Sequence, residues 1–206
     1  MVVLPVFLQA PWVRLHPFSA TLFTAVLMAV GIVLAQTADR QKAEIGQLLV
    51  GFSGSWLAGC LFWGWLRAHP LLHLPVEAFA LPLALTGLNS RWRLAAAFYL
   101  SSLLGTACTD LMMAVTGVMQ AWPTVVMAPI DVAPGLLHQA GLQLLHPLPM
   151  LLLALAAALI LGLGRRWSQM GSTWSMAGAV LVTTVWVDGL FLITALLQPG
   201  LSGLIE

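Results

Sequence analysis

The residues from 69 to 77 bring two histidines and a glutamate into a spacing that could do chemistry. His69, His73 and Glu77 follow one another at intervals of four residues, and positions i, i+4 and i+8 share one face of a helix. Imidazole and carboxylate side chains in such a row could ligate a metal or a pigment, or pass a proton along the helix. Three prolines interrupt the same stretch, so the alternative is a loop that leads into the start of a helix.

Pro75 favours this alternative. Proline is best accommodated in the first turn of a helix, because its missing N–H would be unpaired there in any case. This places His69 and His73 in a loop at the membrane interface and Glu77 in the first turn, where the helix dipole favours a carboxylate. A helix from Pro75 onward has about 14 residues and rises about 21 Å, short of the ~30 Å hydrocarbon core, and Pro82 would kink it. The stretch therefore predicts a short, broken span, and its interruption indicates a pocket.

Three aspartates add to the candidate site. Asp110 and Asp188 fall inside long apolar runs, where an ionised side chain costs at least about 2.5–3.5 kcal/mol. Each must therefore be protonated, face a cavity, or pair with a group from another helix. Asp131 lies between two prolines in an irregular segment. With Glu77, these aspartates are our candidates for ligand binding or proton relay; the alternative for Asp110 and Asp188 is a structural hydrogen bond that joins two helices.

The five histidines all lie near the ends of apolar runs, where a histidine is usually solvated or caps a helix. We retain His73, His138 and His146 as pigment or interface ligands; chlorophyll or carotenoid would be the cofactor of a chain bound to a photosynthetic complex. The spacing of His, Cys, Asp and Glu matches no zinc or iron site, and the sequence has no HExxH, P-loop, GxSxG or CxxCH motif. We therefore expect no metal and no enzyme activity.

The composition identifies the surroundings of these residues. Of the 206 residues, 60% are hydrophobic and 7% are charged, whereas about a quarter of the residues in soluble domains are charged. Apolar runs of about 20 residues recur along the chain and predict an all-α, polytopic membrane protein. We expect one transmembrane domain over residues 1–206, with six spans: about Phe18–Gln36, Ile45–Leu66, Pro70–Leu88, Leu94–Val118, Pro147–Gly164 and Trp174–Leu197.

The segment between the fourth and fifth spans is rich in proline. Residues 119–135 are too irregular to face lipid, because unpaired backbone groups in hydrocarbon cost several kcal/mol. This segment is either a surface loop or a lid folded back against the bundle. From residue 136 to residue 146, polar side chains fall near one side of a helix and leucines on the other, which predicts a short helix at the membrane interface.

The basic residues predict the orientation. Six spans place the first, third and fifth loops on one side, which holds Arg40, Lys42, Arg91, Arg93, Arg165 and Arg166. The opposite side holds only Arg14 and Arg67, so the positive-inside rule puts both termini on the non-cytoplasmic side. The net charge of +1 indicates no nucleic-acid partner. The expected partners are the lipid bilayer and other integral membrane subunits.

Cysteines and tryptophans also occur inside the spans. Cys60 and Cys108 each lie in an apolar run, and we interpret both as small buried hydrophobes rather than as a disulfide. Four tryptophans inside spans could belong to the core or stack on a ligand, and we expect the core: Trp56, Trp63, Trp65 and Trp186.

Three stretches carry a family resemblance: "HLPVEAFALPLALTGLNSRWRLAAAFYLSSLLGT", "TDLMMAVTGV" and "VWVDGLFLITALLQPGLSGL". They resemble an uncharacterised cyanobacterial multi-span membrane family, domain of unknown function 3120. The resemblance implies a cyanobacterial thylakoid or plasma membrane and no established activity. It also implies an association with photosynthetic complexes.

A weaker resemblance is to the S components of energy-coupling-factor vitamin transporters, above all the biotin type. It rests on "LPVE", "GLNSRWR" and Asp188. The chain departs from these six-span proteins in its predicted external termini and in having no lysine after Asp188.

Two functions follow from these observations. The first is a non-enzymatic accessory subunit or assembly factor of a photosynthetic membrane complex, since catalytic motifs are lacking. The alternative is the vitamin-type substrate-binding membrane subunit of a transporter, with Glu77, Asp110, Asp131 and Asp188 lining a pocket. The broken third span fits this alternative, because transporters place binding groups where helices are interrupted.

Overall fold

Helices are the regular elements of this protein. The computed structural model describes residues 3–201, and the elements in that range are α, π and 3₁₀ helices. Six segments are long and apolar enough to cross a bilayer: Pro17–Ala35, Arg40–Leu66, Pro70–Gly87, Arg93–Val115, Pro147–Ser168 and Ser172–Leu197. They agree with the six predicted spans to within a few residues at most ends. The predicted all-α, polytopic membrane fold is confirmed.

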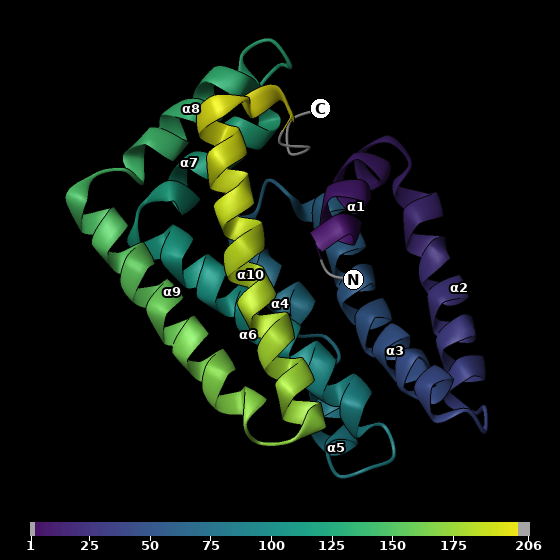
Figure 1. Ribbon diagram of the computed structural model, residues 1–206. Helices are drawn as coiled ribbons and strands as arrows, with labels where there is room; N and C mark the ends of the chain where they lie inside the picture. The colour runs from purple at the N-terminus through teal and green to yellow at the C-terminus, as the bar shows by residue number, and fades with distance from the viewer. Residues whose placement is uncertain (1–2, 202–206) are drawn as a thin grey trace.

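The bundle consists of two helical hairpins on either side of a central helix. Helices α2 (Pro17–Ala35) and α3 (Arg40–Leu61) form one hairpin, and α9 (Pro147–Ser168) and α10 (Ser172–Leu197) form the other. Helix α6 (Arg93–Val115) packs against both α3 and α10 (Figure 1). Side chains on α6 can therefore reach either half of the molecule.

The crossing of α6 and α10 depends on a glycine. A Cβ atom at Gly105 of α6 would lie 2.2 Å from Cγ2 of Thr184 on α10. Small residues of this kind let two membrane helices approach closely, where apolar burial alone gives little driving force. Thr109 and Asp188 follow one helical turn after this contact on their respective helices, so the close approach also brings those two side chains together.

The third span is interrupted. It consists of a 3₁₀ turn (Pro70–Leu72), α4 (His73–Glu77) and α5 (Leu81–Gly87), separated by a turn over residues 78–80. A broken third span is confirmed, but the predicted kink at Pro82 is not. Pro82 lies in the first turn of α5, because without an N–H it cannot continue the hydrogen bonding of a preceding helix.

Helices α7 (Val118–Met127) and α8 (Ala133–Gln143) form a hairpin at one end of the bundle (Figure 1). The prediction that residues 119–135 are irregular was wrong for most of this segment. Val125 of α7 belongs to a buried cluster with residues of α8 and α10. This packing stabilises α7 although Pro123 lies inside it. A short helix was predicted over residues 136–146, and α8 confirms it with bounds three residues earlier at each end.

An additional helix, α1 (Val3–Leu15), precedes the first span and was not predicted. Gln9 fixes it to α3, donating a hydrogen bond to the carbonyl oxygen of Trp56 at 2.7 Å and lying 3.2 Å from Sγ of Cys60. Cys60 and Cys108 are both free thiols, as predicted, but only Cys60 is fully buried and Cys108 is half-buried. Trp56 is part of the core, also as predicted.

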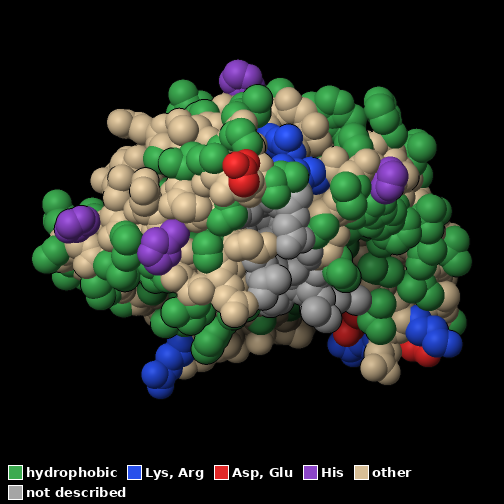
Figure 2. All heavy atoms as spheres, turned by 90° about the horizontal axis from the view of Figure 1, so that it is seen from above, with side chains coloured by type: hydrophobic (Ala, Val, Ile, Leu, Met, Phe, Trp, Pro, Cys, Tyr) green, Lys and Arg blue, Asp and Glu red, His purple; other side chains and the backbone are tan. Residues whose placement is uncertain are grey.

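The two ends of the bundle differ in charge. The loops α2–α3, α5–α6 and α9–α10 lie at the same end of the bundle (Figure 1). The six basic residues that we assigned to the first, third and fifth loops lie in or beside these loops. The other end, seen in Figure 2, shows mainly hydrophobic side chains with histidines at several points. The orientation that we derive from this asymmetry stays a prediction.

Candidate functional site

One histidine and two acids meet inside the bundle, where α4 packs against α6. Nδ1 of His73 lies 2.8 Å from Oδ1 of Asp110, and Nε2 lies 3.9 Å from Oε1 of Glu77. Glu77 is 7% exposed and Asp110 is 9% exposed. Each nitrogen of one imidazole therefore faces a carboxyl group away from solvent. We call these three residues the His73 cluster.

The sequence produces this arrangement through the short helix α4. His73 is its first residue and Glu77 its last, so the i, i+4 spacing places both on one face. The prediction of His73 in a loop and Glu77 in a first turn was wrong. Pro75 is the third residue of α4, where its missing N–H still costs nothing, so the helix begins two residues earlier than we predicted. His69 stays outside α4 and is exposed.

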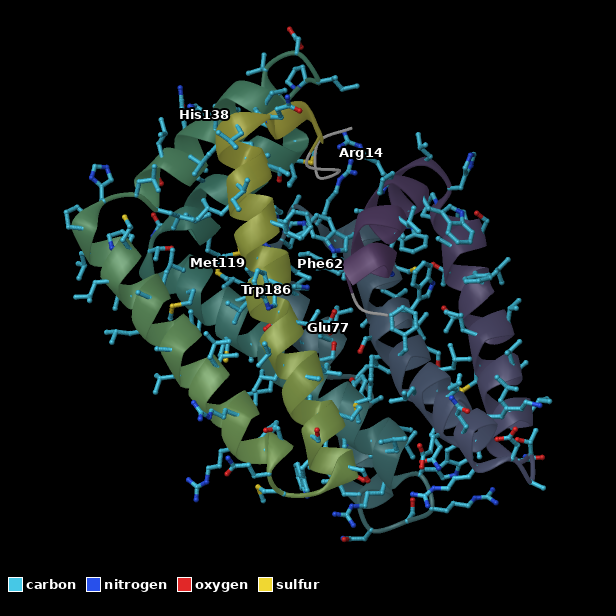
Figure 3. All side chains as sticks on the ribbon, viewed as in Figure 1. Arg14, Phe62, Glu77, Met119, His138 and Trp186 are labelled. Atoms are coloured by element: carbon cyan, nitrogen blue, oxygen red, sulfur yellow. The ribbon has the colours of Figure 1, made fainter. Side chains whose placement is uncertain are left out.

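Phe62 covers the imidazole. Its ring centroid lies 4.2 Å from that of His73, with an angle of 31° between the ring planes, and Phe62 is 2% exposed. Phe62 begins a π-helical segment, Phe62–Leu66, that continues α3. Such segments are frequent at functional sites, because the wider turn changes the direction of side chains. In Figure 3, Phe62 and Glu77 lie together in the middle of the bundle.

Tyr99 closes the gap in the third span. The hydroxyl of Tyr99 on α6 donates a hydrogen bond to the backbone carbonyl of Glu77 and accepts one from the N–H of Ala80 at 3.1 Å. Both backbone groups border the interruption, where unpaired polar groups in hydrocarbon would cost several kcal/mol. We did not predict this role. Tyr99 is the only tyrosine in the chain, and a lone phenol in an apolar span must find a partner, which was the available signal.

Asp188 lies next to the His73 cluster but on the other side of α6. Oγ1 of Thr109 donates a hydrogen bond to Oδ2 of Asp188 at 2.7 Å. Thr109 and Asp110 are consecutive, so α6 directs one polar side chain toward α10 and the next toward α4. Of the alternatives left open for the two aspartates, the structure shows each in contact with a side chain from another helix: His73 for Asp110 and Thr109 for Asp188. Unlike Asp110, Asp188 lies at the surface of the bundle.

The other candidate residues lie elsewhere. Asp131 is exposed in the link between α7 and α8, which agrees with the surface-loop alternative rather than with a pocket shared with the other acids. Nδ1 of His138 lies 3.3 Å from the carbonyl oxygen of Ala195, and His146 is exposed at the start of α9. Neither histidine joins His73: His138 lies on α8 at the end of the bundle (Figure 3), and His146 directly precedes α9.

Two surface cavities of the protein lie apart from the His73 cluster. Within residues 3–201, no group of three or more His, Cys, Asp or Glu side chains is arranged to hold a metal ion. Two surface cavities, of about 300 and 310 Å³, open at opposite ends of the bundle. The first is lined by residues 15–19 and the second by residues from α2, α3 and the start of α6. Neither is lined by a residue of the His73 cluster.

Comparison with known proteins gave one match. A family model described as "Protein of unknown function (DUF3120)" matches residues 1–196. This is the family that the three quoted stretches resemble. No curated protein and no solved structure matches the chain.

Proposed function

The chain belongs to the DUF3120 family, for which no function is established, and we propose that it is a non-enzymatic integral membrane protein that binds and releases a proton inside the bilayer. The observation that carries this proposal is the imidazole of His73 held between the carboxyl groups of Asp110 and Glu77, at 2.8 and 3.9 Å. Ionisable groups at membrane depth are expensive to bury and commonly form proton relays.

The chemistry follows from the charges in the cluster. With both carboxyl groups ionised, the cluster has a net negative charge whether the imidazole is neutral or protonated. In a medium of low dielectric constant, a net charge is destabilised far more than in water. A proton shared along the row lowers that charge, and imidazole is the side chain best suited to accept and return it near neutral pH.

The broken third span places this site beside an interruption in a helix. Glu77 is the last residue of α4, and its own carbonyl is held by Tyr99 at the interruption. A change in the protonation of Glu77 therefore acts directly beside the break. Discontinuous helices of this kind form the binding sites of many transporters. We infer a proton-coupled transport role, which refines the transport-subunit hypothesis drawn from the sequence.

A vitamin-sized substrate is not part of this proposal. Small-molecule sites usually occupy about 300–1,000 Å³, and two cavities of about that size lie away from the His73 cluster. The ligand of the cluster itself is the proton.

The test is proton flux in reconstituted vesicles. The purified protein is placed in liposomes that contain a pH-sensitive dye, and a potassium gradient with valinomycin drives proton uptake. We expect the wild-type protein to acidify the lumen faster than protein-free liposomes, and Asp110→Asn to abolish the difference. Wild-type flux equal to that of protein-free liposomes would contradict the transport role.

A second candidate function is favoured by the outer face of α10. Asp188 lies at the bundle surface in the interior of a span, and Trp186 is 68% exposed, so the prediction that Trp186 belongs to the core was wrong. A polar carboxyl facing lipid at this depth is unfavourable, and a partner helix would cover it. This supports an accessory subunit or assembly factor of a membrane complex.

The family resemblance makes this second candidate more specific. The complex would be a photosynthetic one in a cyanobacterial thylakoid or plasma membrane, with chlorophyll or carotenoid as the cofactor. Isolation from the native membrane in mild detergent tests it. Photosystem subunits and pigment absorption in the purified sample would support it, and a protein that runs alone without absorbance beyond that of its aromatic residues would contradict it.

A further inference from the structure

A cavity at the basic end of the bundle has the features of a phosphate site. It measures about 310 Å³ and is lined by Ala35, Gln36, Gln47, Arg91 and Trp92. These residues come from the end of α2, the first half of α3 and the loop before α6. The cavity is thus at the level where three spans end, which is the headgroup region of a bilayer.

The lining supplies hydrogen-bond donors. Arg91 contributes a guanidinium, Gln36 and Gln47 contribute amide NH₂ groups, and Trp92 contributes an indole N–H. The guanidinium carbon of Arg91 lies 5.3 Å from the centroid of the Trp92 ring. This cation–π contact limits the freedom of the long Arg91 side chain. A guanidinium donates two parallel hydrogen bonds to phosphate oxygens, which makes it well suited to bind that group.

The charge of Arg91 is not neutralised by the nearby acids. At the same end, Oε1 of Glu44 lies 3.0 Å from Nε of Arg40, and Oδ2 of Asp39 lies 3.7 Å from Nζ of Lys42. Both acids are thus paired within the first turns of α3. Among the residues that the structure describes, Arg91 has no acidic partner within ion-pair distance. Its positive charge is available to a ligand.

We propose that this cavity binds the phosphate group of an anionic ligand at the membrane surface. Anionic lipids present a phosphate at the depth of the cavity, and basic pockets between transmembrane helices bind such headgroups. Free phosphate offers the same chemistry from the aqueous side. The site is separate from the His73 cluster, so it does not depend on the proton-binding role.

Native mass spectrometry of the full chain in a neutral detergent tests the proposal. The protein is mixed with phosphatidylglycerol or with zwitterionic phosphatidylcholine, and the bound fraction is measured for the wild type, Arg91→Gln and Arg165→Gln. Arg165 is an exposed arginine at the same end that does not line the cavity. We expect preferential binding of phosphatidylglycerol, a loss of roughly tenfold in affinity for Arg91→Gln, and wild-type binding for Arg165→Gln.

Two further measurements complete the test. Arg91→Lys retains the charge but not the paired donors, so it should bind phosphatidylglycerol less tightly than the wild type. It replaces Arg91→Gln as the test variant if Arg91→Gln does not fold. Displacement of phosphatidylglycerol by millimolar inorganic phosphate would identify free phosphate as a ligand of the site, and its absence would identify the lipid. Equal binding of both lipids, or equal losses for Arg91→Gln and Arg165→Gln, would overturn the proposal.

Discussion

Nδ1 of His73 on α4 lies 2.8 Å from Oδ1 of Asp110 on α6, and this hydrogen bond joins the broken third span to the central helix. Thirty-seven residues separate the two in sequence. The contact is partly buried beneath Phe62 and lies one turn from Glu77. We propose that it links the stability of the bundle to the protonation of its interior.

Removal of Asp110 should therefore destabilise the protein. Asp110→Leu leaves the His73 ring without its partner in a partly buried site, and a buried polar group left unpaired typically costs about 1–3 kcal/mol. Asp110→Asn keeps an acceptor for the His73 N–H and should be affected less. Thermal unfolding in detergent, followed by tryptophan fluorescence, measures both. A stability of Asp110→Leu equal to that of Asp110→Asn would refute the pairing.

The interruption of the third span should depend on one hydroxyl group. Tyr99→Phe removes the partner of both Glu77 C=O and Ala80 N–H, and unsatisfied buried groups cost about 1–3 kcal/mol each. Thr183→Val is the control, because Thr183 bonds only within its own helix, to Ala179, and should change stability by less than about 0.5 kcal/mol. Similar effects of the two substitutions on chemical denaturation would show that Tyr99 does not hold the break.

The crossing of α6 and α10 should tolerate no added methyl group. A Cβ at Gly105 would lie 2.2 Å from Cγ2 of Thr184, so Gly105→Ala must separate the helices and should cost about 1–3 kcal/mol. Gly189→Ala is the matched control, since a Cβ there meets nothing within 4 Å. The double variant Gly105→Ala with Thr184→Ser, which removes the clashing methyl, should recover stability. Failure of this rescue would place the strain elsewhere.

Asp188 offers a test that separates folding from partner binding. Asp188→Asn still accepts the hydrogen bond of Thr109, so we expect normal accumulation in the membrane. If a partner helix covers this carboxyl, the variant should lose co-purifying subunits while the Asp131→Asn control, altered in an exposed loop, retains them. Poor accumulation of Asp188→Asn would instead indicate that the carboxylate is required for folding.

The number and bounds of the spans followed from the sequence because a bilayer requires long apolar segments and little else in the chain has that length. The sequence also restricted any partner of Asp110 and Asp188 to another helix, since neither had a basic neighbour in its own turn, but it left open whether a partner existed. These predictions depend only on which residue types follow one another along the chain.

The rotation of each helix did not follow from the sequence. In a chain this apolar, lipid-facing and core-facing residues are alike, so no periodicity indicated that Trp186 faces outward or that His73 faces Asp110. Proline misled the prediction of residues 119–135, because tertiary packing of Val125 stabilises α7 despite Pro123. The sequence also left open whether Asp131 lines a pocket with the other acids, because composition does not show that the link between α7 and α8 is exposed.

The most direct test of the central claim is an infrared titration of the purified protein, which follows the C=O stretch of protonated carboxyl groups as pH is raised. We predict a band that titrates in the wild type, is lost or shifted in both Asp110→Asn and Glu77→Gln, and is unchanged in Asp131→Asn. A carboxyl band that does not vary with pH, or that persists unaltered in both cluster variants, would contradict proton binding by His73, Glu77 and Asp110.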